Sequence, residues 1–224
     1  MQKQNDISDV FQVRKHTPEY IDLRISEVQK HFEDRIESIR KINEKYFQLL
    51  CLFSLIDSLA QEYSNYSRGQ EQKKFTNFVL EFQKKWDFLE YTDPITFYYD
   101  VQEHLIESVN LDSLSEGNVY SPAHMIKSEM TEKIVACLEE KGVQNINDCK
   151  RKHRYVDLLY KMRSKLSHEL STSGSVSLMG LGEKEPLPYY VSVSRVYSTD
   201  EKIMEDDIWE LVVPVEFIEL LLRE

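Results

Sequence analysis

The sequence predicts an all-α helical bundle that ends in a small β-hairpin and a short terminal helix. Its 224 residues include six glycines and six prolines, too few for the many tight turns of an all-β sandwich. Through most of the first 170 residues, apolar positions recur at the three- and four-residue spacing of helices, and strand-like residues follow only later. With 41% apolar residues, the chain has enough material for a packed core.

Three regions follow from this pattern. Residues 1–16 lack periodicity and are expected to form a loose lead-in. Residues 17–170 are expected to form the helical bundle. Residues 171–224 are expected to hold a flexible loop, the hairpin and the terminal helix, packed on the same domain.

The first helix begins at Thr17-Pro18, a cap residue followed by proline at the first helical position. No glycine or proline then appears until Gly69. One unbroken helix over this span would exceed the usual length in globular proteins, so we predict two helices that meet near residues 41–45. A third helix is expected over residues 71–86.

The same local signal predicts two further helices. Asp93-Pro94 begins a helix that runs to residue 109, and Ser121-Pro122 begins one that runs to residue 140. The last long helix is expected to open at residues 145–148 and to run to residue 170. Its apolar stripe consists of Val156, Leu159, Met162, Leu166 and Leu170.

The pattern changes after this helix. Residues 171–188 contain three of the six glycines and two prolines, which predicts the flexible loop. β-Branched and aromatic residues over 190–196 and 208–213 predict the two strands of the hairpin. Pro214 then begins the terminal helix, expected over residues 215–222.

The net charge of the chain is −11, from 28 basic and 39 acidic residues, which argues against a general nucleic-acid binder. Three scattered cysteines are too few for a disulfide framework, and the N-terminus lacks the apolar core of a secretory signal. No apolar stretch approaches the ~20 residues of a membrane span. These observations predict a cytoplasmic protein with no membrane partner.

The charge is distributed unevenly along the sequence. Residues 150–165 carry seven basic residues and one acid, a net charge of +6 that leaves −17 for the rest. Residues 199–224 are the reverse, with nine acids and two bases. The basic segment is either a phosphate-facing strip or a solvated helix face neutralised by the acidic C-terminal region. The RNA-binding residues predicted in it are Lys150, Arg151, Arg154, Lys161 and Lys165.

Arg163 and His168, at this strip, suit the cleavage of RNA without a metal ion or a cofactor. In that reaction the ribose 2′-hydroxyl attacks the neighbouring phosphate, which requires a base, an acid and a fixed cation. Histidine can exchange protons near neutral pH, because its ordinary pKa is about 6.5. Arginine stays charged and can bind a phosphate through two N–H groups. The sequence therefore predicts Arg163 and His168 as a catalytic pair.

A single histidine cannot easily act as base and acid at once, so the chemistry predicts a symmetric homodimer that joins two Arg163–His168 pairs. On an ideal helix these residues lie about 140° apart, so the pair of one protomer does not converge. Ser164 lies one turn before His168 and can hydrogen-bond its ring, which gives it a supporting role. The spacing alone carries little information, because Arg24 and His31 satisfy a loose version of it.

Residues 160–169, Tyr-Lys-Met-Arg-Ser-Lys-Leu-Ser-His-Glu, resemble the Arg-x4–6-His motif of the HEPN superfamily (higher eukaryotes and prokaryotes nucleotide-binding). Their setting, late on the last long helix of an all-α bundle, is also similar. Residues 46–60 and 74–78 resemble the early helices of bacterial members. The resemblance covers roughly residues 45–170 and implies a HEPN-like bundle.

The resemblance further implies a homodimeric, metal-independent endoribonuclease of the kind used in toxin–antitoxin and phage-defence systems, with Arg163 and His168 as the catalytic residues. RNA, a second copy of the chain, and an antitoxin or other regulatory protein are the implied partners. Ser164 stands where active members often carry Asn, Asp or His. This difference keeps an alternative open, a catalytically silent HEPN-like module that binds a nucleotide or a partner protein.

Two other groups of polar residues have competing interpretations. Cys137, Cys149 and His153, with His124 as a fourth ligand, could bind zinc, but their spacing fits no compact zinc motif, and cysteines are often simply buried. We therefore expect no metal. Asp57 lies among apolar residues and is either turned toward the site or on the solvent side of its helix, with the solvent side favoured.

Overall fold

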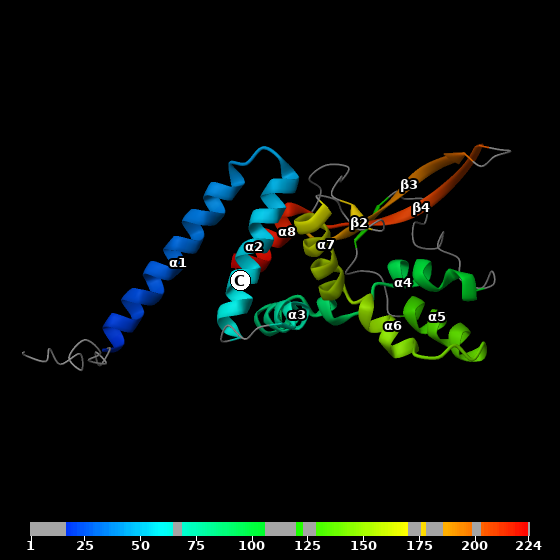
Figure 1. Cartoon of the computed structure of the whole chain (residues 1–224), viewed down its shortest axis with the longest axis horizontal. Coiled ribbons are helices and arrows are strands. Elements are labelled where there is room, and N and C mark those ends of the chain that lie inside the picture. Colours follow the sequence, from blue (N-terminus) through cyan, green and yellow to red (C-terminus); the bar gives the residue numbers. More distant parts are fainter. Residues whose placement is uncertain are drawn as a thin grey trace, which may run out of the picture. The chain divides into compact units, whose positions relative to one another are not determined.

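The structure, a computed structural model, describes residues 17–64, 69–105, 120–122, 129–169, 176–177, 186–198 and 203–223 (Figure 1). The chain divides into two compact units, Met1–Lys41 and Ile42–Glu224. The predicted lead-in and most of the predicted loop over 171–188 lie outside the described residues. Within the described ranges, no helix has both the length and the hydropathy needed to cross a membrane.

The first unit contributes one long helix, α1 (Pro18–Arg40). The hydroxyl of Thr17 accepts a hydrogen bond from the backbone N–H of Tyr20 at 3.3 Å, which caps the helix as the sequence predicts. The second unit opens with α2 (Lys45–Tyr63), so the predicted division into two helices is confirmed.

The main core of the second unit lies among four helices, which are α2, α3 (Glu71–Phe82), α7 (Tyr155–Glu169) and α8 (Val215–Arg223). Large side chains fully buried in this unit include Leu49, Phe53, Phe75, Met162 and Phe217. The predicted stripe on α7 is buried at Val156, Leu159, Met162 and Leu166, while Leu170 lies outside the described residues. The predicted terminal helix is confirmed by α8.

A smaller core cluster joins α4 (Pro94–Val101) to α5 (Glu129–Glu140). Its buried side chains are Phe97, Val101, Ile134 and Leu138, and the short helix α6 (Ile146–Lys152) packs on it through Ile146 and Cys149. Asp93 caps α4 by accepting from the backbone N–H groups of Ile95 and Thr96, at 3.2 and 3.1 Å. The predicted start of this helix is confirmed.

Two helices end earlier than the sequence predicts. α3 ends at Phe82 rather than residue 86, because the backbone leaves the helical conformation at Gln83. The side chain of Gln83 donates to the carbonyl of Leu221 in α8 at 2.7 Å. A short 3-10 turn, η2 (Asp87–Glu90), follows. α4 gives way to another, η3 (Gln102–His104), rather than continuing to residue 109.

The single long helix predicted over residues 145–170 is wrong, because the chain breaks between α6 and α7. At the break, the backbone of residues 153–155 pairs with that of residues 91–93. The N–H of Asp93 donates to the carbonyl of His153 at 2.7 Å, and the N–H of Tyr155 donates to Tyr91 at 3.1 Å. These non-local bonds use backbone groups that an unbroken helix would need internally.

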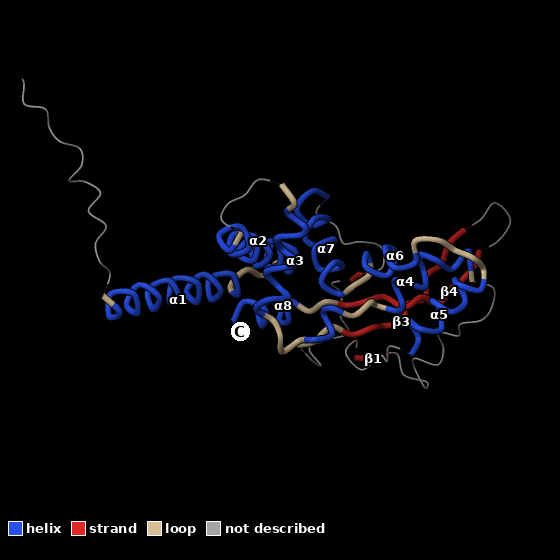
Figure 2. Tube along the Cα trace, turned by 90° about the horizontal axis from the view of Figure 1, so that it is seen from below, coloured by secondary structure: helices blue, strands red, loops and turns tan. Residues whose placement is uncertain are grey.

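The predicted hairpin is confirmed by β3 (Tyr189–Ser198) and β4 (Ile203–Val212), which pair antiparallel. Two short strands extend it, β1 (Tyr120–Pro122) against β3 and β2 (Val176–Ser177) against β4. α4 lies against β4 of this sheet (Figure 2). The helix predicted to start at Ser121-Pro122 is therefore wrong at that point; an edge strand tolerates proline because its missing N–H can face away from the ladder.

Buried hydroxyl groups tie the sheet to the helices. The Tyr190 hydroxyl donates to the Asp93 carboxylate, and it lies 2.5 Å from the hydroxyl of Tyr155 on α7. Asp93 and Tyr190 are fully buried, and burial raises the pKa of Asp93 despite the hydrogen bonds that favour its charged form. The starts of α4 and α7 are thus fixed to β3 by polar contacts.

Candidate functional site

The predicted catalytic arginine lies in an ion pair between two helices. On α7, Arg163 donates from Nε and Nη2 to a single oxygen of Asp57 on α2, at 2.6 and 2.5 Å. Both side chains are about three-quarters buried, with 22% and 26% of their surfaces exposed. Asp57 therefore turns toward α7, and the solvent-side orientation favoured from the sequence is wrong.

Burial and the ion pair act on Asp57 in opposite directions. Burial raises the pKa of its carboxyl, while the hydrogen bond and the charge of Arg163 lower it, and the net shift is upward. The Tyr160 ring lies 5.8 Å from Cζ of Arg163, within cation–π range. A guanidinium has five N–H donors, so Arg163 retains donors beyond the two that Asp57 accepts.

His168 lies in the last turn of α7 and is exposed. Because α7 is a regular helix through Glu169, Arg163 and His168 stay about 140° apart around its axis, and the structure does not bring them together within one chain. No hydrogen bond joins Ser164 to His168 among the described residues. Instead, the hydroxyl of Ser167 donates to the carbonyl of Arg163 at 2.9 Å.

The basic strip spans two helices and is more neutralised than the sequence suggests. Arg154 donates to the buried carboxylate of Asp157 at 2.7 Å, and Lys165 donates to both oxygens of Glu169 at 2.8 Å. Arg151 lies 3.4 Å from Asp148 in an exposed pair. With Arg163 included, four of the seven basic residues over 150–165 are paired with a carboxylate. Three of these carboxylates lie outside residues 150–165, so the charge count of that range did not include them.

The other two predicted RNA-binding lysines differ in burial. Lys150, at the end of α6, is partly exposed. Lys161 is partly buried, and burial lowers the pKa of its ammonium, an effect that the charges of Asp100 and Asp157 oppose. Contact with RNA at either residue remains a prediction.

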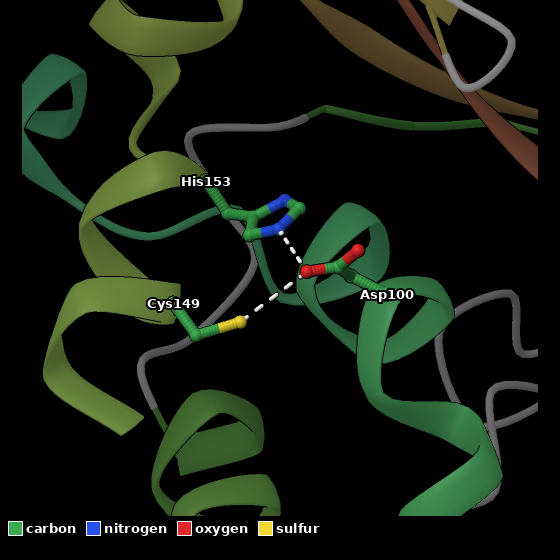
Figure 3. Close-up of side chains that lie close together, drawn as sticks. All are labelled: Asp100, Cys149 and His153. Atoms are coloured by element: carbon green, nitrogen blue, oxygen red, sulfur yellow. Dashed lines mark hydrogen bonds and ion pairs between the residues drawn. The ribbon is translucent and has the colours of Figure 1, made fainter. Parts of the chain in front are cut away.

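A second polar cluster lies at the junction of α4 and α6 (Figure 3). One oxygen of Asp100 lies 3.0 Å from Nε2 of His153 and accepts a hydrogen bond from the thiol of Cys149 at 3.3 Å. The other ring nitrogen of His153 lies 3.2 Å from the hydroxyl of Thr96. His153 is buried, Cys149 is partly buried and the Asp100 side chain is half exposed.

Sequence reasoning found only half of this cluster. Cys149 and His153, four residues apart, were considered together, but Cys137 on α5 is not part of the group, and His124 lies outside the described residues. Asp100 was missed because it stands 49 residues before Cys149 in the sequence. The sequence feature that could have indicated Asp100 is its four-residue spacing from Thr96, which places both side chains on one face of α4.

No family model, curated protein or solved structure matches this chain. The interpretation of both polar sites therefore depends on their residues and geometry.

Proposed function

We propose that this protein is a homodimeric endoribonuclease of HEPN type that cleaves RNA without a metal ion. The observation that carries the proposal is the placement of Arg163, which Asp57 holds while other N–H donors stay available, five residues before an exposed histidine on the same helix. A cellular setting with an antitoxin or another regulatory protein belongs to the same proposal.

The proposed reaction needs only side chains of the two protomers. His168 of one protomer takes the proton of the 2′-hydroxyl as that oxygen forms a bond to phosphorus. His168 of the other protonates the 5′-oxygen as its bond to phosphorus breaks. The products are a 2′,3′-cyclic phosphate and a 5′-hydroxyl. Arg163 offsets the charge that develops on the phosphoryl oxygens, and Asp57 positions the guanidinium.

Self-association is supported by exposed apolar side chains on α1. Ile21, Ile25 and Val28 are spaced four and three residues apart and so share one face, and each has about half of its surface exposed, at 46%, 51% and 50%. Exposed apolar stripes of this kind mark association surfaces more often than isolated apolar residues do.

The test is cleavage of single-stranded RNA by the purified full chain, with the chemical nature of the new ends determined. We expect cyclic phosphate and 5′-hydroxyl ends, no cleavage when the 2′-hydroxyl is replaced by hydrogen, and no cleavage by Arg163→Ala or His168→Ala. Arg24→Ala and His31→Ala, which change another arginine and histidine exposed on α1, are the matched controls. Cleavage by all four variants alike would refute the proposal.

One observation favours the alternative, a catalytically silent module that binds a nucleotide or a partner protein. The Asp57 carboxylate offsets the charge of Arg163, which reduces what the guanidinium offers to a phosphate. The same assay separates the two functions. Retention of RNA or nucleotide at low salt, weakened by Arg163→Ala but never followed by cleavage, would establish the silent module.

A further inference from the structure

The junction between α4 and α6 gathers three side chains whose donor atoms suit a transition metal. Asp100 offers a carboxylate oxygen, Cys149 a sulfur and His153 an imidazole nitrogen, and these atoms all lie within 4.8 Å of one another (Figure 3). We infer that they bind a divalent zinc-class ion, which leaves one coordination position for water or another ligand.

Two of the three separations between donor atoms are close to those of a tetrahedral site, and all three are within 4.8 Å. Ligand atoms around a tetrahedral zinc ion lie about 3.3–3.6 Å apart, given the usual zinc–oxygen, zinc–nitrogen and zinc–sulfur bond lengths. The Asp100 oxygen lies 3.0 Å from Nε2 of His153 and 3.3 Å from Sγ of Cys149. Small side-chain rotations would therefore admit the ion between groups that are already adjacent.

The local fold holds the ligands in place. Cys149 and His153 are one helical turn apart at the end of α6, and the carbonyl of His153 accepts the 2.7 Å hydrogen bond from Asp93. Thr96, one turn before Asp100 on α4, lies 3.2 Å from Nδ1 of His153. A threonine hydroxyl can donate or accept, so it can accept from Nδ1–H when Nε2 binds a metal.

The ligand types select the class of ion. Thiolate and imidazole ligands favour zinc and its substitute cobalt over magnesium and calcium, which prefer oxygen. Three protein ligands with a fourth position left open are also typical of zinc sites that bind a water or a substrate. The side chain of Asp100 is half exposed, so an ion can reach the cluster from the solvent.

Metal binding is expected to displace one proton. A thiol has to lose its proton to bind a metal ion, whereas a carboxylate and a neutral imidazole bind through lone pairs that they already have.

The first experiment is titration of the full chain with cobalt(II) alone. We expect a near-ultraviolet thiolate-to-cobalt charge-transfer band in the unmodified protein and in Cys137→Ser, a matched change at another partly buried cysteine. The band should be lost in Cys149→Ser. Absence of the band from the unmodified protein, or its persistence in Cys149→Ser, would overturn the inference.

The second experiment measures zinc affinity and proton release. We expect about one proton released per zinc ion at pH 7, and an apparent affinity that rises with pH, because the thiol has to lose its proton to bind the metal. Cys149→Ser and Asp100→Asn should weaken binding at least tenfold, with circular dichroism confirming that each variant is folded. Binding without proton release, or binding equally strong in both variants, would contradict the site.

This inference and the proposed ribonuclease can fail separately. Cys149→Ser removes the metal site and leaves Asp57, Arg163 and His168 unchanged. A ribonuclease that persists in Cys149→Ser, together with loss of the cobalt band, would support both assignments.

Discussion

Two aspartates on distant helices contact the side chains of the two proposed sites, and they do so differently. Asp57 on α2 faces one guanidinium, which never loses its charge. Asp100 on α4 bridges an imidazole and a thiol, both of which can exchange a proton or be taken by a metal. The contact of Asp57 is a fixed ion pair that positions a cation. The contacts of Asp100 are hydrogen bonds that a bound metal ion could replace.

The two aspartates act on opposite sides of α7. Arg163 faces Asp57, whereas the charge of Lys161 acts on Asp100, and residues two apart on a helix point about 200° apart. One helix therefore separates a proposed phosphate site from a proposed metal site. The predictions below test whether the two sites are chemically independent.

The largest effect is expected at His168. Removing one general acid–base group costs about 10²- to 10⁴-fold in rate, and His168→Ala removes both the base and the acid of the dimer. RNA cleavage should therefore fall by more than that factor, below detection, while zinc binding stays unchanged. Single-turnover cleavage assays and zinc titrations on the same preparation measure both. A parallel loss of zinc binding would show that the sites are coupled.

The next effect is expected at Thr96, which positions His153. Loss of a group that orients a metal ligand weakens binding by about 10- to 100-fold, so Thr96→Val should do so while RNA cleavage is retained. Competition with a chromophoric chelator gives the affinity. Thr96→Ser, which keeps the hydroxyl, should restore it, and an equal loss in both variants would argue against the hydrogen bond as the cause.

A smaller effect concerns acid stability without metal. The folded-state pKa of His153 lies below the ordinary value of about 6.5, so the unfolded chain takes up the proton first. The stability from its neutral ring is complete above that pH and is lost as pH falls toward the folded-state pKa, by at most about 1.4 kcal/mol per pH unit.

Urea unfolding at several pH values between 5 and 7 measures this loss. His153→Gln should flatten the pH dependence, and an unchanged dependence in this variant would contradict the assignment to His153. Asp57 acts with the opposite sign at lower pH. Its raised pKa adds stability below about pH 3.8 that is lost as pH rises through the folded-state value.

The smallest effect is expected from neutralising Asp57. Asp57→Asn keeps an oxygen acceptor for Arg163 but removes the charge. Because burial raises the pKa of Asp57 despite Arg163, the charged carboxylate adds no net stability, and the free energy of unfolding at pH 7 should stay within about 1 kcal/mol of the unmodified value. RNA cleavage should fall if Asp57 positions Arg163. Asp148→Asn, in the exposed pair with Arg151, is the control and should change stability by less than about 0.5 kcal/mol.

Local signals in the sequence predicted the elements that depend on neighbouring residues. Thr17-Pro18 and Asp93-Pro94 predicted two helix starts, and the β-branched run after residue 189 predicted β3. The same signal, a cap residue followed by proline, gave a wrong prediction at Ser121-Pro122, because that segment pairs with β3 as an edge strand. A local sequence pattern does not show which distant segment will form hydrogen bonds with the backbone of the residues concerned.

The polar sites were predictable only in pieces. Arg163 and His168 were found from their residue types, but the orientation of Asp57 depends on how α2 packs against α7, more than 100 residues later. Cys149 and His153 were visible as a helical pair, and so were Thr96 and Asp100. That the two pairs face each other follows from the break at residue 153, which non-local backbone pairing creates.

The bridge between Thr92 and Arg154 has a consequence for how the chain can vary. The chain leaves the main core at Thr92 and returns at Arg154, which lies beside Thr92. The segment between them, called the excursion below, contains α4, α5 and α6 and has its own small core. All three proposed metal ligands and Thr96 lie within this excursion, and Asp57, Arg163 and His168 lie outside it. Because β1 and Asp93 belong to this segment and are bonded to β3, it cannot be removed or exchanged without changing the sheet. Insertions at its exposed turns, such as the one between α5 and α6, should cost little, about 0.6 kcal/mol per doubling of loop length.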